Sequence, residues 1–146
     1  MLDAKIHHNN LINSILAKIQ ANVAGVDDAL MLDGRGFVAE TNATHVFAVT
    51  RGVVETPRCV ACPEGITRSV VMRLCREHNL PHGERDLSLA EFYRADEMFC
   101  TGTMGELAPV IELDGRPIAD GKPGSVTAQL SNWFAELTAR EGVAVT

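Results

Sequence analysis

The chain has 146 residues, of which 46% are hydrophobic, a size and composition typical of one domain with a substantial core. Its formal net charge is −6, with 19 acidic and 13 basic residues spread along the chain, which argues against a nucleic-acid partner. No apolar run approaches the roughly 18 to 20 residues of a membrane span, and the first residues lack the order of a signal peptide. We therefore expect a cytoplasmic protein without nucleic-acid or membrane partners, with one domain over residues 1–146.

The first half of the chain predicts one helix and two hairpins. Apolar residues at steps of three and four predict an amphipathic helix over residues 9–24, which ends at Gly25. Apolar stretches on either side of Asp33-Gly34 predict a hairpin over residues 29–40, and a second hairpin follows over residues 46–54.

The second half continues in the same mixed manner. Helical spacing returns over residues 67–78 and again over residues 125–140. Short apolar stretches predict strands near residues 98–100 and 110–113, and Asp114-Gly115 predicts a further hairpin turn. Helices mixed with hairpins indicate the α+β class.

Two segments have the chemistry of anion sites. Gly65, Ile66, Thr67 and Arg68 stand at the expected start of a helix, where unpaired amides and the positive end of the helix dipole favour a phosphate. Thr67 as an ordinary N-cap is the alternative interpretation. The loop 101–105 offers two threonines and two glycines after a strand, and it could equally be a glycine-rich turn capped by threonine.

Two charged residues are candidates for a different role. Glu40 ends an apolar strand, so its carboxylate could be partly desolvated and would then need a cationic partner such as a protonated pyridine nitrogen. A solvated strand end is the alternative. Lys5 could form an imine only if its surroundings lower its pKa, and most lysines near a chain end are solvated surface groups.

The cysteines do not by themselves define a metal site. Cys59-Val60-Ala61-Cys62 has the spacing of half a zinc ribbon or of a redox pair, but no second cysteine pair follows at ligand spacing. We expect reduced thiols and no metal ion.

Taken in order, these segments resemble the class IV aminotransferases, the fold-type IV pyridoxal-phosphate enzymes that include branched-chain and D-amino acid aminotransferases and aminodeoxychorismate lyase. Each segment is short, but the order and separations fit the family over essentially the whole chain. The matching stretches are Ala4-Lys5, residues 36–42, Thr56-Pro57, residues 64–68, residues 95–103, Pro109-Val110, Asp114-Gly115 and residues 124–127.

The resemblance implies a role for each candidate. Lys5 would carry pyridoxal 5'-phosphate as a Schiff base and move the proton, and Glu40 would pair with the pyridine nitrogen. Ile66, Thr67 and Thr103 would hold the phosphate, while the amides of Thr103 and Met104 would receive the substrate carboxylate. The expected fold is the large carboxyl-terminal domain of these enzymes, and a homodimer is the expected assembly.

Within the family, the loop Thr101-Gly102-Thr103-Met104 looks like the transaminase version. The expected reaction moves an amino group between an amino acid, with branched-chain substrates favoured, and a 2-oxo acid such as 2-oxoglutarate. D-amino acid aminotransferase and aminodeoxychorismate lyase are the alternative enzymes. The resemblance also implies a smaller amino-terminal domain before the lysine, which we expect to be missing from this chain. An inactive truncated remnant is therefore the alternative outside catalysis.

Overall fold

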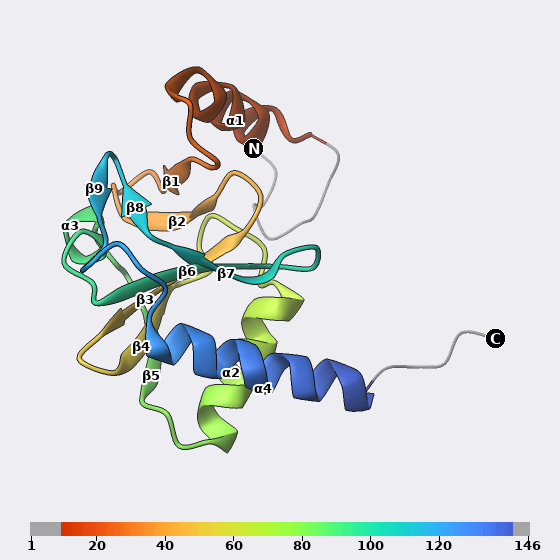
Figure 1. Ribbon diagram of the computed structural model, residues 1–146. Coiled ribbons are helices and arrows are strands. Elements are labelled where there is room, and N and C mark those ends of the chain that lie inside the picture. Colours follow the sequence, from red (N-terminus) through yellow and green to blue (C-terminus); the bar gives the residue numbers. More distant parts are fainter. Residues whose placement is uncertain (1–9, 142–146) are drawn as a thin grey trace.

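A five-stranded sheet organises residues 10–141, the part of the chain that the computed structural model describes (Figure 1). Only β4 and β5 run parallel to one another, and the other neighbouring pairs are antiparallel. In spatial order the strands are β5 (His82–Arg85), β4 (Val53–Pro57), β3 (His45–Thr50), β6 (Glu97–Gly102) and β7 (Glu106–Val110).

The connections follow from the turn chemistry. β3 and β4 are joined through Arg51 and Gly52, which both have positive φ angles, 52° and 76°, as a tight hairpin turn requires. β4 and β5 are parallel and therefore need a crossover, which the helix α2 (Ile66–Glu77) provides.

Two helices cover one face of the sheet. α2 and α4 (Ser125–Glu141) lie side by side below the strands in Figure 1. Phe47 and Phe99 point into this layer from neighbouring strands, and their rings stack with 4.9 Å between centroids. Val71, Leu74 and Leu130 complete the contact from the helices, which makes this layer the larger of two apolar cores.

Short elements cover the opposite face. The hairpin of β1 (Leu30–Leu32) and β2 (Val38–Thr41), the helix α3 (Leu89–Phe92), and the pair β8 (Glu112–Leu113) and β9 (Arg116–Pro117) lie there. Core side chains from these elements and from the residues beside them meet Val46, Ala48 and Met98 of the sheet, and include Val38, Leu87, Phe92 and Ile118.

The first helix leaves its apolar face uncovered within the described part of the chain. α1 (Ile12–Ala24) lies apart from the sheet in Figure 1, and Ala21 is its one buried residue. Ile12, Ile15 and Ile19 are each more than half exposed, at helical spacing. A stripe of this kind is typical of a surface that packs against something else. No helix among residues 10–141 is long and apolar enough to cross a membrane.

Most sequence predictions of secondary structure are confirmed, with three corrections. β5 and α3 were not predicted because each has four residues and no apolar periodicity. The strand predicted over residues 110–113 is instead the end of β7 followed by β8. β7 begins at Glu106, directly after a short loop.

A buried carboxylate joins the sheet to the last helix. Glu97 on β6 is 9% exposed and accepts hydrogen bonds from the amides of Val126 and Thr127, at 2.9 and 2.7 Å. The Thr127 hydroxyl donates to the same carboxylate at 2.8 Å. The close approach needs Gly124, where an added Cβ would lie 1.9 Å from the Glu97 carboxyl carbon. Glu97 therefore acts as an N-terminal cap of α4 supplied by the sheet.

We expect Glu97→Ala to lower the free energy of unfolding by about 2 kcal/mol, because two amides at the start of α4 and the Thr127 hydroxyl lose a charged acceptor. Urea unfolding followed by circular dichroism measures the change. Glu136→Ala, at an exposed position on α4, is the matched control. Equal stability of the two variants would contradict the capping role.

Candidate functional site

The turn between β2 and β3 is the centre of the candidate site. The Thr41 hydroxyl accepts hydrogen bonds from the amides of Ala43 and Thr44, at 3.2 and 2.9 Å, and lies 2.7 Å from the Thr44 hydroxyl. The backbone closes the same turn, since the Thr41 amide donates to the Thr44 carbonyl. This geometry fixes Glu40 on one side of the turn and His45 on the other.

Glu40 is a half-buried carboxylate without a partner in the described part of the chain. No side chain or amide among residues 10–141 donates a hydrogen bond to it, and no cation pairs with it there. Burial raises the pKa of Glu40 to about 7, because the charged form loses solvation and gains nothing in return. A carboxylate in this state fits a cationic hydrogen-bond donor supplied by a ligand.

The second anchor is the N-terminus of α2. The helix begins at Ile66 after Gly65, whose φ of 72° few other residues adopt, and no side chain caps it. The first intrahelical bond runs from the Ser69 amide to the Gly65 carbonyl, so the amides of Ile66, Thr67 and Arg68 precede the helical ladder. Thr67 lies inside the helix, so its alternative interpretation as the N-cap is wrong. Three open amides at this end favour an anion.

His45 brings this helix end to the turn. Its Nε2 lies 2.8 Å from the Pro63 carbonyl, and its ring packs against Gly65. A Cβ at Gly65 would lie 2.4 Å from the His45 ring carbon Cε1, so only glycine fits. The start of β3 and the start of α2 are therefore in direct contact.

The loop 103–105 between β6 and β7 approaches the same turn from the other side. Thr101 pairs with His45 across the sheet, and a Cβ at Gly102 would lie 3.2 Å from the Thr44 methyl group. Thr103 and Met104 are exposed, Met104 at 99%. The hydroxyl of Thr101 is buried without a hydrogen-bond partner within residues 10–141.

The structure thus connects the three predicted segments that it describes. Glu40, the start of α2 with Ile66 and Thr67, and the loop with Thr103 and Met104 all adjoin the turn at residues 41–45. Lys5 lies outside the described residues. His45 was not predicted as the link, because no local spacing connects a histidine at a strand start to a glycine twenty residues later.

Comparison with known proteins identifies the family. The family model described as "Amino-transferase class IV" matches residues 2–113. The chain belongs to the class IV aminotransferases, as the order of its segments predicted.

Curated relatives with similar sequences are also named as aminotransferases or aminotransferase-like proteins. The chain is 55% identical over 144 residues to branched-chain-amino-acid aminotransferase-like protein 2 of Arabidopsis thaliana, covering 99% of this chain and 26% of the relative. It is 42% identical over 126 residues to the branched-chain-amino-acid aminotransferase of Pseudomonas aeruginosa, covering 86% of this chain and 41% of the relative. A D-alanine aminotransferase of Listeria innocua is 36% identical over 128 residues, covering 87% of this chain and 44% of the relative.

Solved structures confirm the predicted fold. A branched-chain amino acid aminotransferase from T.th., crystallised with pyridoxamine 5'-phosphate, superposes with a TM-score of 0.91 at 36% identity, over 97% of this chain and 47% of that one. The enzyme of Thermobaculum terrenum in its PLP form gives 0.90 at 37% identity, over 94% of this chain and 46% of that one. The chain has the fold-type IV architecture and spans about half the length of these solved structures. It spans less than half the length of the three curated relatives named above.

The unpaired state of Glu40 predicts an unusual pH dependence. A folded-state pKa near 7, against an ordinary 4.5, means that the folded chain binds more protons between those values. The stability contribution of Glu40 is therefore highest below pH 4.5 and falls as the pH rises toward 7.

We expect Glu40→Gln to stabilise the ligand-free chain at pH 8 by about 1 kcal/mol, after allowance for solvent screening of a half-buried group. The gain should vanish near pH 4. Urea unfolding at both pH values measures it, with the exposed Glu112→Gln as control. A loss of stability at pH 8 would show that the carboxylate has a cationic partner within the chain.

Proposed function

We propose that residues 1–146 form the pyridoxal-phosphate-binding domain of a transaminase. Its reaction moves an amino group between an amino acid, with branched-chain substrates favoured, and a 2-oxo acid such as 2-oxoglutarate. The observation that carries the proposal is Glu40, a half-buried carboxylate without a partner among residues 10–141, on the same turn that receives the open N-terminus of α2. The two groups match the opposite charges of one ligand, a protonated ring nitrogen and a phosphate.

Different residues would bind the two charged ends of the cofactor. Bound pyridoxal phosphate supplies an electron sink for carbanionic charge. Glu40 would accept the hydrogen bond of the protonated ring nitrogen and keep that proton in place. The amides of Ile66 and Thr67, the Thr67 hydroxyl and Thr103 would hold the phosphate, so that the ring cannot rotate away from Glu40.

The reactive amine would come from Lys5. A lysine is useful for this purpose as a nucleophile and as a base that carries a proton between two positions on one side of the ring. The amides of Thr103 and Met104 would receive the substrate carboxylate, since a loop this exposed leaves its backbone accessible to a ligand.

The cofactor step can be tested by chemical trapping, because the chain has only three lysines, Lys5, Lys18 and Lys122. The purified chain is mixed with pyridoxal 5'-phosphate, reduced with borohydride and digested for mass spectrometry. We expect the phosphopyridoxyl mass on Lys5, with loss of the visible Schiff-base absorption in Lys5→Ala.

Lys122→Ala is the matched control, since Lys122 is exposed and pairs only with the exposed Asp120 within the described residues. It should leave both signals intact. Label distributed evenly over the three lysines would contradict a dedicated site, and so would a visible band of unchanged intensity in Lys5→Ala.

The substrate is tested by amino transfer to 2-oxoglutarate. The relatives named above motivate three donors, L-leucine, L-isoleucine and D-alanine. We expect glutamate formation with the branched-chain donors at a kcat/KM at least about tenfold above that with D-alanine, which corresponds to about 1.4 kcal/mol of transition-state discrimination.

A preference for D-alanine would favour the D-amino acid alternative. Release of pyruvate from aminodeoxychorismate, without amino transfer to 2-oxoglutarate, would overturn the transaminase in favour of the lyase. The fold and the trapping result on Lys5 would stand in both cases, because the three enzymes share the cofactor.

The proposed assembly is a cytoplasmic homodimer. The uncovered apolar stripe of α1 supports a contact with other parts of the protein or with a second copy. The four cysteines are free thiols in the structure, as expected in a reducing compartment.

A further inference from the structure

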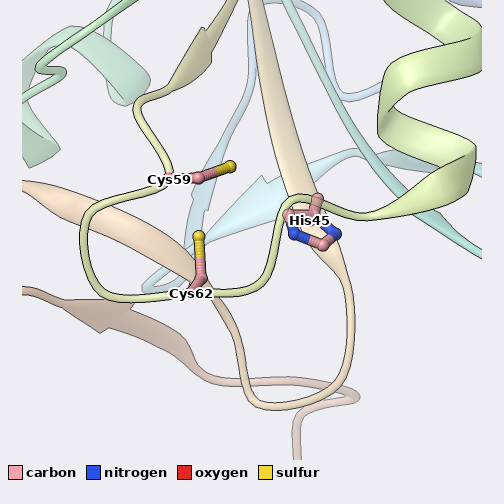
Figure 2. Close-up of side chains that lie close together, drawn as sticks. All are labelled: His45, Cys59 and Cys62. Atoms are coloured by element: carbon pink, nitrogen blue, oxygen red, sulfur yellow. The ribbon is translucent and has the colours of Figure 1, made fainter. Parts of the chain in front are cut away.

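Three side chains that can bind a metal converge next to the start of α2. His45 opens β3, while Cys59 and Cys62 lie in the loop between β4 and α2. Their ligand atoms all lie within 4.8 Å of one another. Figure 2 shows the Cys62 sulfur pointing toward Cys59, with the His45 ring alongside. The third ligand that the sequence did not reveal is therefore present in the fold.

The donor set selects the metal. Two thiolates and an imidazole are the ligands of tetrahedral zinc, with Zn–S near 2.3 Å and Zn–N near 2.1 Å. Tetrahedral coordination places such donors about 3.5 to 3.8 Å apart. The observed upper limit of 4.8 Å lies about 1 Å above this spacing. Zinc binding therefore requires the ligand atoms to approach one another by up to about that distance.

The surroundings orient two of the three ligands, His45 and Cys62. The His45 ring is held between the Pro63 carbonyl and Gly65, and the Cys62 sulfur lies 3.8 Å from the Ala39 carbonyl. Packing and polar contacts of this kind orient metal ligands before the ion arrives.

The charge balance also suits zinc. Cys62 is 1% exposed and Cys59 is half-buried, so their thiolates need a compensating positive charge, and a divalent cation matches their two negative charges. Arg68, the cation beside them, is already paired with Glu84 and with the Pro57 carbonyl. The thiol protons leave to solvent as the two Zn–S bonds and one Zn–N bond form, and no oxidant is needed.

We propose that His45, Cys59 and Cys62 bind one zinc ion, with water in the fourth position. The ion would fasten the loop at residues 58–65 to the first residue of β3 and thereby hold the N-terminus of α2 against the turn at residues 41–45. We assign the ion this positioning role because none of the three ligands belongs to the residues proposed to bind cofactor or substrate.

Metal content is the direct test and requires no cofactor. The chain is purified with a non-thiol reductant, loaded with zinc, dialysed and analysed by mass spectrometry for metals. We expect one zinc per chain and a melting temperature about 5 to 10 °C above that of the chelator-treated protein. Cobalt in place of zinc should give thiolate charge-transfer absorption and the visible bands of tetrahedral coordination.

Three variants assign the ligands. Cys59→Ser, in the half-buried loop, and His45→Gln should each lose the zinc and the thermal shift, while their chelator-treated forms melt near the wild-type value. Cys75→Ala removes a thiol from α2 outside the cluster and should keep both. The Cys59→Ser comparison remains informative if His45→Gln folds poorly, because the chelator-treated melt reports folding separately.

Two results would overturn the proposal. One is zinc at full stoichiometry in Cys59→Ser or in a well-folded His45→Gln. The other is a reduced wild-type chain that takes up neither zinc nor cobalt. A disulfide between Cys59 and Cys62 in protein purified without reductant, with no metal uptake after reduction, would identify a redox pair instead. Lysine trapping reports cofactor bound at Lys5 and is measured separately from zinc uptake.

Discussion

The contact between Gly65 and the His45 ring decides how the rest of the candidate site is assembled. Any side chain at position 65 would enter that ring, and the positive φ that starts α2 is adopted easily by glycine. Because His45 begins β3 directly after the Thr41–Thr44 turn, the same contact fixes the distance between the helix end and Glu40. The contact between Gly65 and His45 thus positions both the positive end of the α2 dipole and the Glu40 carboxylate.

Glu40 shows that the site is not arranged for the stability of the empty chain. A half-buried carboxylate with no hydrogen-bond donor within the described residues lowers the stability of the folded chain. The Glu97 carboxylate is more deeply buried, but it accepts hydrogen bonds from three donors. Glu97 therefore has a structural role, whereas the environment of Glu40 fits a carboxylate that binds a ligand. A cofactor that supplies the missing donor would convert the cost at Glu40 into binding free energy.

Much of this could be predicted from the sequence, and the remainder could not for physical reasons. The long helices and the hairpins at Asp33-Gly34 and Arg51-Gly52 follow from local periodicity and turn chemistry, and the family order pointed to Glu40 and the start of α2. β5 carries no periodic signal, because a short polar strand is determined by its parallel partner β4. His45 beside Cys59 and Cys62 depends on a tertiary contact between two segments, which no local spacing encodes.

The loop at residues 58–65 connects the two inferences drawn from the site. It carries Cys59 and Cys62 at one end and the Gly65 turn into α2 at the other. An ion that draws the cysteines toward His45 shortens the same span that sets the direction of α2. Ordering a connecting loop before a ligand arrives reduces the entropy that binding must overcome. Zinc and phosphate would then bind cooperatively through a shared loop, although they occupy different positions and contact different residues.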